Sequence, residues 1–270
     1  MSAANTDTSP RIAARFAACA AADRAALVGY LTAFDPDRDG SLERIFAACE
    51  AGLDVLELGV PFSDPAADGP TIQAAMTRAL DAGASLEGTL EIAAAVRARF
   101  DLPIVLFGYA NPLIRRMHRD GGLIDALVGA GVDGLLVVDL PPEHCAVLRD
   151  PARAAGLDWI GLCAPTSTEG RIASVLAVTT GFVYAVSLTG VTGAKLDVDD
   201  PELHAQLAAL RARAGVPVAV GFGVRTGEQV KALARHADGV VVGSALVEAG
   251  QAGPEALAAK VRELAAGLGR

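Results

Sequence analysis

The segment AGLDVLELG at residues 51–59 places a glycine between a helical pattern and a short run of aliphatic residues. The glycine can adopt the left-handed conformation that ends a helix, and the run after it has the length and composition of a buried strand. The same order returns in AGVDGLLVV at 130–138 and AGLDWIGLC at 155–163, with AGVP at 214–217 as a variant. The repeated unit is therefore a helix, a glycine stop and a buried strand.

Eight apolar runs of strand length alternate with helical patterns along the chain. Alternating strands and helices predict a parallel sheet covered by helices, and eight parallel strands are the number that closes a barrel. We therefore expect an α/β fold, a (β/α)8 TIM barrel. The runs are ALVGYLT (26–32), LDVLELG (53–59), PIVLFG (103–108), VDGLLVV (132–138), LDWIGLC (157–163), GFVYAV (181–186), VPVAVG (216–221) and DGVVVG (238–243).

The alternation would also fit an open, doubly wound sheet, so the glycines help to choose between the two folds. The dinucleotide-binding glycine pattern of such sheets is missing after the first run. Its nearest match, GFG at 221–223 with Gly227, follows the seventh run, where barrels often bind phosphate. Residues 1–10 predict a disordered tail, and residues 11–22 predict an extra helix before the barrel. No linker interrupts residues 11–270, which predict a single domain.

Composition restricts the class of partner. The 270 residues are 52% hydrophobic and only 4% aromatic, which suits a large aliphatic core, and the net charge is -9. An acidic surface disfavours nucleic acid and anionic membranes, whose phosphates attract clustered Lys and Arg. The sequence shows neither a signal peptide nor a run of roughly 18 uncharged apolar residues that could span a membrane. We expect a cytoplasmic protein that binds neither nucleic acid nor membrane and holds an anionic substrate with backbone amides.

The cysteines and histidines predict neither a disulfide framework nor a metal site. The four cysteines are widely spaced without a CxxC pair, and Cys49 and Cys163 lie in apolar segments, where we expect them to be buried. The histidines lack the HExxH spacing of zinc enzymes, and we interpret them as surface residues. They are His118, His144, His204 and His236.

Glu57 is the first candidate catalytic residue, in the segment LELGVPFSDPAADGPTIQ at 56–73. Side chains alternate along a strand, so Leu56 and Leu58 share one face and Glu57 lies on the other. With the leucines packed against helices, Glu57 points into the barrel near the carboxyl end of its strand. Burial there would raise its pKa toward the range useful for general acid–base catalysis. The alternative interpretation is a buried ion pair with an arginine or lysine.

Asp68 is the second candidate, in a loop that follows the same strand and therefore lies on the same face of the barrel. The segment PAADGP at 65–70 frames it, which indicates a shaped loop. The alternative interpretation is an ordinary turn aspartate that binds its own backbone. We interpret Asp64, in the same loop, as structural, and we expect Thr71 to cap the helix that follows.

Two glycine-rich segments predict a phosphate site. GFG at 221–223 follows the seventh strand run, and Gly243 with Ser244 opens a short helix after the eighth. Backbone N–H groups of accessible glycines and of a helix N-terminus attract anions without Lys or Arg. Taken alone, each glycine segment could be only a tight turn. The loop Thr189–Gly193 could act as a lid that excludes water, or be a plain surface loop.

Together these motifs resemble the tryptophan synthase alpha subunit family. LELGVPFSDPAADGPTIQ at 56–73 is similar to the signature of that family. Further matches are GYLTAFDPD (29–37), LFGYANP (106–112), GVDGLLVVDLPPE (131–143), SLTGVTGA (187–194) and VAVGFGVRTGEQV (218–230). The resemblance covers roughly residues 11–265. It implies a carbon–carbon lyase that cleaves indole-3-glycerol phosphate to indole and D-glyceraldehyde 3-phosphate, the penultimate step of L-tryptophan biosynthesis.

The resemblance also implies the roles of the two carboxylates. Glu57 would protonate indole C3 and help to deprotonate the hydroxyl beside the bond that breaks. Asp68 would stabilise positive charge on the indole nitrogen and take up its proton. Tyr184, inside the sixth run, would support Glu57 and the substrate.

The remaining site residues would bind the substrate. Tyr30 and Phe107 would line the indole pocket, and Thr192 would close the lid over Asp68. The resemblance implies no metal and no organic cofactor on this chain. The phosphate would be bound by the N–H groups of Gly193, Gly223, Gly243 and Ser244.

Family members pair with a beta subunit that carries pyridoxal phosphate, in an α2β2 heterotetramer, and pass indole to it through a tunnel. The resemblance implies the same partner here, with a contact surface on the catalytic face at Pro61–Asp64, Asn111 and Pro141-Pro142. The chain departs from some members at Ala66-Ala67, Leu188 and Tyr30, and none of these departures removes a catalytic group.

Two other functions remain open from the residues alone. Another phosphate-binding barrel enzyme, such as a sugar-phosphate isomerase or a prenyltransferase, would share the glycine site but would not need Glu57 and Asp68 together. An alpha-like subunit with an allosteric role and negligible turnover would have no use for two intact carboxylates. No lysine lies within a strand run, which disfavours a Schiff-base aldolase.

Overall fold

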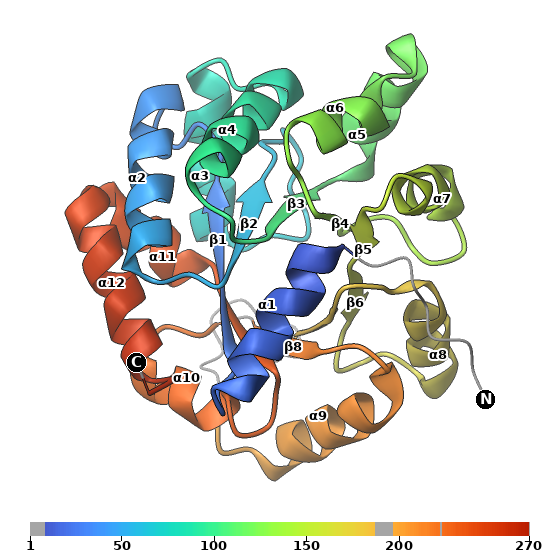
Figure 1. The fold of residues 1–270 in the computed structure, drawn as a ribbon, viewed down its shortest axis with the longest axis vertical. Helices are drawn as coiled ribbons and strands as arrows, with labels where there is room; N and C mark the ends of the chain where they lie inside the picture. Colours follow the sequence, from blue (N-terminus) through green and yellow to red (C-terminus); the bar gives the residue numbers. More distant parts are fainter. Residues whose placement is uncertain (1–8, 187–196, 222, 270) are drawn as a thin grey trace.

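Nine parallel strands form one sheet in the order β5-β4-β3-β2-β1-β9-β8-β7-β6, and helices surround it (Figure 1). The computed structural model describes residues 9–186, 197–221 and 223–269. The two ends of the strand order, β5 and β6, are neighbours in the sequence, separated only by Ile160. The two ends of the sheet therefore meet and nearly close it, and the expected α/β barrel is confirmed.

The strands are short and mostly buried. The sequence predicts eight of them, and the difference is the fifth run, 157–163, which is divided at Ile160. Its first part pairs with β4 and its second part pairs with β7. The strands are β1 (Ala26–Thr32), β2 (Val55–Gly59), β3 (Ile104–Gly108), β4 (Gly134–Val137), β5 (Asp158–Trp159), β6 (Gly161–Cys163), β7 (Val183–Val186), β8 (Val218–Gly221) and β9 (Gly239–Val242).

Helices follow the strands, and the extra helix before the first strand is present as predicted. It begins at Pro10, inside the expected tail 1–10, of which residues 1–8 lie outside the described residues. The helices are α1 (Pro10–Ala21), α2 (Arg38–Ala51), α3 (Pro70–Asp81), α4 (Leu86–Arg99), α5 (Ala110–Asp120), α6 (Leu123–Gly129), α7 (Ala146–Ala154), α8 (Glu169–Val178), α9 (Pro201–Ala214), α10 (Gly227–Leu233), α11 (Ser244–Gln251) and α12 (Pro254–Ala266).

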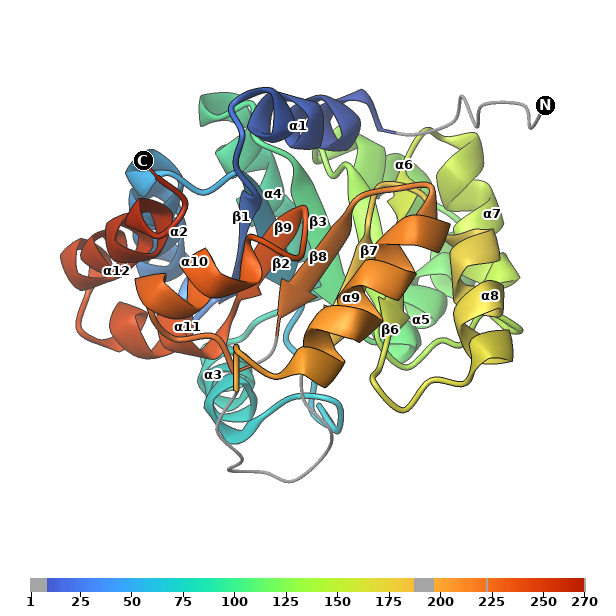
Figure 2. The ribbon, with the colours of Figure 1, turned by 90° about the horizontal axis from the view of Figure 1, so that it is seen from below.

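The strands separate two layers of the core. Inward side chains such as Val55 form an inner cluster, while Leu56 and Leu58 belong to an outer cluster packed against the helices. Ile12 and Phe16 of α1 join the inner cluster, so α1 covers one end of the barrel (Figure 2). Full burial of such side chains stabilises the fold by about 1.5–3 kcal/mol each.

The aspartate two residues after the glycine of the repeated unit has a structural role. Gly52 ends α2 in the left-handed conformation (φ 117°), and the aspartate two residues later accepts a hydrogen bond from the neighbouring strand. Asp54 and Asp133 accept from the Leu27 and Ile104 N–H groups, both at 2.8 Å, and each pairs with an arginine, which compensates the cost of burying its charge. Asp158 in the third copy instead accepts from the Ser9 N–H. Asp238, outside the repeat, accepts from the Val218 N–H at 2.9 Å and pairs with Arg211.

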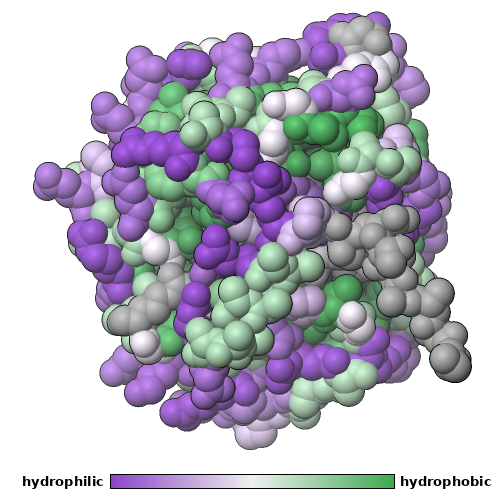
Figure 3. Space-filling view, viewed as in Figure 1, coloured by the Kyte–Doolittle hydropathy of each residue, from purple (hydrophilic) through white to green (hydrophobic). Residues whose placement is uncertain are grey.

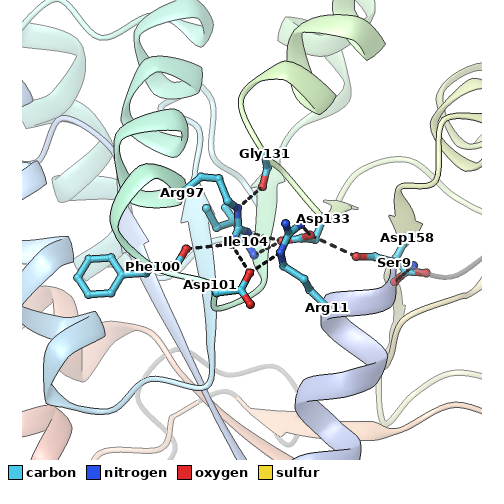
Figure 4. A network of polar contacts seen from close by, with 9 residues as sticks. All are labelled: Ser9, Arg11, Arg97, Phe100, Asp101, Ile104, Gly131, Asp133 and Asp158. Atoms are coloured by element: carbon cyan, nitrogen blue, oxygen red, sulfur yellow. Dashed lines mark hydrogen bonds and ion pairs between the residues drawn. The ribbon is translucent and has the colours of Figure 1, made fainter.

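Polar contacts also fasten the start of α1 to the barrel (Figure 4). Arg11 and Arg97 donate to the two oxygens of Asp133, at 3.0 and 2.6 Å. The Ser9 N–H donates to Asp158 at 2.9 Å, and burial raises the pKa of that carboxyl to about 6. This network lies where α1 crosses the barrel, so it holds the covering helix in place.

The histidines follow the surface interpretation only in part. His118 and His144 are exposed, as predicted. His204 and His236 are half-buried instead, and their rings stack with centroids 3.7 Å apart. The interpretation is wrong for this pair because α9 and the turn after α10 pack side by side, which single-segment patterns do not show.

The surface agrees with the composition. The face in Figure 3 carries hydrophilic side chains over most of its rim, with hydrophobic residues mainly in recesses between them. Cys49 and Cys163 are buried, as expected. Within the described part of the chain, no helix combines the length and apolar character needed to cross a membrane.

Candidate active site

Glu57 lies near the carboxyl end of β2 and faces the inside of the barrel. Its neighbours alternate as predicted, with Val55 in the inner cluster and Leu56 and Leu58 in the outer one. Only 1% of Glu57 is exposed. In the strand register it stands beside Tyr30 of β1.

The carboxyl group of Glu57 has the environment of a general acid rather than of an ion pair. Its Oε1 is buried and has no hydrogen-bond partner among the described residues. Burial raises the pKa of Glu57 to about 8, because a carboxylate loses its hydration in the barrel. At neutral pH the group therefore carries a proton that it can donate.

Asp68 lies in the loop between β2 and α3, and its carboxylate accepts a hydrogen bond from the Tyr109 hydroxyl at 2.6 Å. The same hydroxyl accepts a bond from the Ala67 N–H at 3.0 Å. Burial raises the pKa of Asp68, while the bond from Tyr109 acts in the opposite direction. The described bond of this side chain is thus with Tyr109 rather than with its own backbone.

Tyr109 is a residue that sequence reasoning missed. It follows β3 directly, is buried, and stacks on Phe62 with ring centroids 4.9 Å apart. The available signal was its place in LFGYANP, immediately after a barrel strand and therefore on the same face as Asp68.

Tyr30 and Phe107 form one aromatic wall inside the barrel. Their ring centroids are 5.0 Å apart, with the rings edge to face at 74°. The Thr32 hydroxyl donates to the Tyr30 oxygen at 3.2 Å. The Tyr30 ring crosses β2 at Gly59, where a Cβ atom would lie 2.2 Å from the tyrosine hydroxyl oxygen. Glycine at this position leaves the room that the ring needs.

Tyr184 of β7 packs with the inner cluster of the barrel. Burial and the negative charges of Glu57 and Asp68 raise its pKa well above the ordinary value. The pKa of Tyr30 is raised by burial and by the same two charges. Tyr30 stands beside Glu57 in the strand register. A Cβ at Gly221 of β8 would lie 2.8 Å from the Tyr184 hydroxyl oxygen.

The segments predicted to bind phosphate lie at the same end of the barrel. Gly243 is the N-cap of α11, and Ser244 is its first residue, so free N–H groups of a helix start lie at the end of β9. Gly243 adjoins Tyr30, since a Cβ there would lie 3.5 Å from the Cβ of that tyrosine. Gly223 follows β8 and is exposed, with a positive φ of 79°.

Glu248 of α11 is a second residue that the sequence did not single out. Its carboxylate accepts from the Thr71 hydroxyl at 3.0 Å and forms an ion pair with Arg225. The prediction that Thr71 caps α3 is therefore wrong, and Gly69 is the N-cap. The reason is that Thr71 faces α11, which lies close to α3 in space but far along the chain. Glu248 links three segments: the start of α3, the loop after β8, and α11.

Some predicted features are not described. Thr192 and Gly193, with the rest of the expected lid, lie outside the described residues.

Asp64 is exposed and accepts a bond from the Ser63 hydroxyl at 2.7 Å. Among the residues that the structure describes, no group of three or more His, Cys, Asp or Glu could hold a metal ion.

Related sequences agree along nearly the whole chain. A family model described as tryptophan synthase alpha chain matches residues 16–268. The tryptophan synthase alpha chain of Gluconacetobacter diazotrophicus is 48% identical over 269 residues, covering 96% of this chain and 97% of that protein. The one from Burkholderia thailandensis is 48% identical over 260 residues, covering 96% and 95%.

Solved structures agree as well. The tryptophan synthase of Mycobacterium tuberculosis, in an open form with BRD0059 bound, superposes with a TM-score of 0.87 at 37% identity, covering 96% of this chain and 98% of that one. The tryptophan synthase subunit alpha of Legionella pneumophila superposes with a TM-score of 0.86 at 34% identity, covering 96% and 98%. The match to the family model and the identity to these relatives over nearly the whole chain show that the chain belongs to the tryptophan synthase alpha chain family.

Proposed function

We propose that Glu57 and Asp68 are the acid–base pair with which this chain cleaves indole-3-glycerol phosphate to indole and D-glyceraldehyde 3-phosphate. Tryptophan synthase alpha chains are the lyase component of the tryptophan synthase complex, so the reaction class follows from the family. The observation that carries the proposal is that Glu57, buried on β2 beside Tyr30, and Asp68, bonded to Tyr109 just after β3, lie at the same end of neighbouring barrel strands. Two acids that share one space can act on one substrate.

Glu57 supplies the proton that starts the cleavage. A carbon–carbon bond to an indole ring breaks by a retro-aldol step only if the ring can accept the bonding electrons. Protonation of indole C3 makes the ring such an acceptor, and Glu57, with a pKa raised to about 8, is protonated at neutral pH. Once it has given up this proton, the carboxylate of Glu57 can take the proton of the hydroxyl beside the breaking bond. The aldehyde carbonyl then forms, and the electrons of the broken bond restore the indole.

Asp68 serves the other end of the ring. C3 protonation places positive charge on the indole nitrogen; an ionised carboxylate stabilises that charge and can take up the N–H proton, which it returns to the nitrogen as the carbon–carbon bond breaks. The hydrogen bond from Tyr109 favours the ionised form of Asp68, which suits this role. In this proposal Glu57 donates a proton while Asp68 accepts one, the division of labour expected of two carboxylates in one site.

The substrate lies between the aromatic wall and the glycine segments in this proposal. Tyr30 and Phe107 line the indole pocket, and Tyr184 supports Glu57 and the substrate. The phosphate is bound by backbone N–H groups, because the net negative charge of the chain does not attract an anion. Thr192 closes the lid over Asp68. The proposed N–H donors are Gly193, Gly223, Gly243 and Ser244.

We also propose the assembly and the extent of the catalytic unit. Residues 11–270 form one catalytic domain, which the continuous nine-stranded sheet supports. The family implies a beta-subunit partner, and we propose an α2β2 heterotetramer with contacts at Pro61–Asp64, Asn111 and Pro141-Pro142. This chain needs no cofactor of its own in the proposed chemistry, because proton transfer alone supplies the electron sink. Pyridoxal phosphate belongs to the beta subunit.

Substituting the two carboxylates tests the proposal. Glu57→Gln and Asp68→Asn should each lower the rate of indole release from indole-3-glycerol phosphate by at least about 10²-fold, because positioned acid–base groups contribute about 10²–10⁴. Glu169→Gln is the matched control, since Glu169 is an exposed carboxylate on α8. Near-normal turnover in either site variant would refute the assignment. If the wild-type chain releases no indole even with a beta subunit added, another phosphate-binding barrel activity would take its place.

A further inference from the structure

The barrel wall contains a seam between β4 and β6. β4 pairs with β5 as far as Leu135 and Trp159, and the Ile160 N–H makes the next bond, to the Leu135 carbonyl at 2.8 Å. From Gly161 onward the chain pairs with β7 instead. In the described strand order β5 and β6 are the two ends of the sheet, and no pairing joins β6 to β4.

A cavity of about 210 Å³ lies at this seam. Its walls are the end of β4 with the loop that follows, the β5–β6 segment, and one side of α8. The two short strands lie beside α7 and α8 at the right of Figure 1. Most of the lining side chains are apolar, among them Val137, Val138, Trp159, Leu162, Val175 and Val178.

This seam cavity is separate from the candidate active site. Val138 and Leu162 pack with the inner cluster that includes Phe107 and Tyr184. Trp159 belongs to the outer cluster under the helices. Val138 and Leu162 thus belong both to the cavity wall and to the inner cluster, whereas neither Glu57 nor Asp68 lines the cavity.

The charged groups at the seam cavity are already engaged. Among its described lining residues, Arg171 and Asp139 carry charge. Arg171 Nη1 donates to both carboxylate oxygens of Glu143, at 3.0 and 2.8 Å. Asp139 accepts a bond from the Ala110 N–H at 2.7 Å. A charged ligand would have to compete with these bonds, so the cavity favours a neutral one.

We propose that the seam cavity binds a neutral aromatic molecule of one or two rings. An apolar cavity of about 150 Å³ in another protein stays dry and binds benzene, so the volume here suffices for a ring. Indole, the aromatic product of the proposed function, has these properties. Naming indole rests on that function, whereas the existence of the site does not.

Trp159 provides a direct readout, since it lines the cavity and is the only tryptophan of the chain. Titration with toluene, excited where toluene does not absorb, should change Trp159 emission saturably with a Kd of about 1 mM or tighter, within reach of a ligand of seven non-hydrogen atoms. Val178→Phe fills the cavity from α8 and should weaken this Kd by at least about tenfold. Val147→Phe is the matched control, because Val147 is an exposed valine on the neighbouring α7.

Crystals of the wild-type chain soaked in bromobenzene test the location without any variant. Anomalous density for bromine beside Trp159 and Val175 would support the site. Bromine found only inside the barrel near Tyr184, or no saturable emission change up to the solubility of toluene, would overturn it. Equal Kd values for Val178→Phe and Val147→Phe would overturn it as well, provided that both variants melt as cooperatively as the wild type. None of these experiments uses substrate, so a failed lyase assignment and an empty seam are separate outcomes.

Discussion

The Tyr109 hydroxyl donates a 2.6 Å hydrogen bond to the carboxylate of Asp68. It also accepts a bond from the Ala67 N–H, which occupies an oxygen lone pair and leaves the hydroxyl hydrogen directed at Asp68. A donor of this kind stabilises the charged form of a carboxylate. Tyr109, the residue after β3, therefore holds the second acid of the proposed pair in position and opposes the effect of burial on the pKa of that acid.

Tyr109→Phe should lower kcat by about tenfold or more, because a hydrogen bond to a charged group contributes about 1.5–3 kcal/mol and 1.4 kcal/mol corresponds to a factor of ten. The acidic limb of the kcat profile should move to higher pH, since Asp68 loses the bond that opposes the effect of burial on its pKa. The variant keeps the ring that stacks on Phe62. An unmoved acidic limb would show that Tyr109 does not control the ionisation of Asp68.

The pKa of Glu57 should set the alkaline limb of the same kcat profile. The group must be protonated to act first as an acid, and its pKa is raised to about 8. Activity should therefore be retained below that pH and fall as the pH rises through about 8. The measurement is kcat from pH 6 to 10 with saturating substrate, roughly two units on either side of the titration. A limb centred near the ordinary pKa of a glutamate would contradict the buried, protonated state.

Folding stability should depend on Glu57 with the corresponding sign. The pKa rises from an ordinary 4.5 in the unfolded chain to about 8 in the folded one, so the folded state binds the extra proton between these values. Its contribution to stability is complete below pH 4.5 and decreases as the pH rises toward about 8, by at most about 1.4 kcal/mol per pH unit. Glu57→Gln should remove this slope in urea unfolding curves compared at pH 5 and about pH 8. Equal slopes for variant and wild type would contradict it.

Much of the barrel was predictable because its signals are local. Gly52 ends α2 in a left-handed backbone conformation that glycine adopts easily. The short aliphatic run after it has the composition of a buried strand, and it forms β2. The inward direction of Glu57 followed from alternation with Leu56 and Leu58 alone. Such features need no knowledge of distant segments.

The features that escaped prediction depend on what lies opposite. The fifth strand is divided at Ile160 because its first half pairs with β4 and its second half pairs with β7. No local sequence pattern predicts this division. Thr71 was expected as a helix cap but faces Glu248, 177 residues away. Tyr109 has its role only because the loop after β2 brings Asp68 within reach of the end of β3.

Gly59→Ala should damage the site by a purely steric route. The added Cβ would overlap the Tyr30 hydroxyl, so the ring must move, and overpacking of this kind costs about 1–3 kcal/mol. We expect a higher KM for indole-3-glycerol phosphate together with a lower Tm. Gly129→Ala is the control, because its Cβ would meet nothing within 4 Å and alanine suits its place in α6. If Gly59→Ala binds substrate normally, Tyr30 does not line the indole pocket.

Asp133 should control stability without touching catalysis. Its buried carboxylate accepts the Ile104 N–H and pairs with Arg11 and Arg97 where α1 covers the barrel, away from the end that holds Glu57. Removing one member of a buried pair leaves the others without compensation, so Asp133→Ala should lower the free energy of unfolding by about 3–5 kcal/mol.

Asp101→Ala is the matched control for this variant, because Asp101 also pairs with Arg11 but is 88% exposed, and it should leave the urea midpoint unchanged. Both variants should cleave substrate at the wild-type rate per folded molecule. A small loss of stability in Asp133→Ala would mean that Arg11 and Arg97 find other partners. The polar network would then contribute little to the stability of the α1 contact. A loss of turnover in fully folded Asp133→Ala would mean that the covering helix is coupled to the carboxylates, with the inner cluster, which α1 joins, as one route.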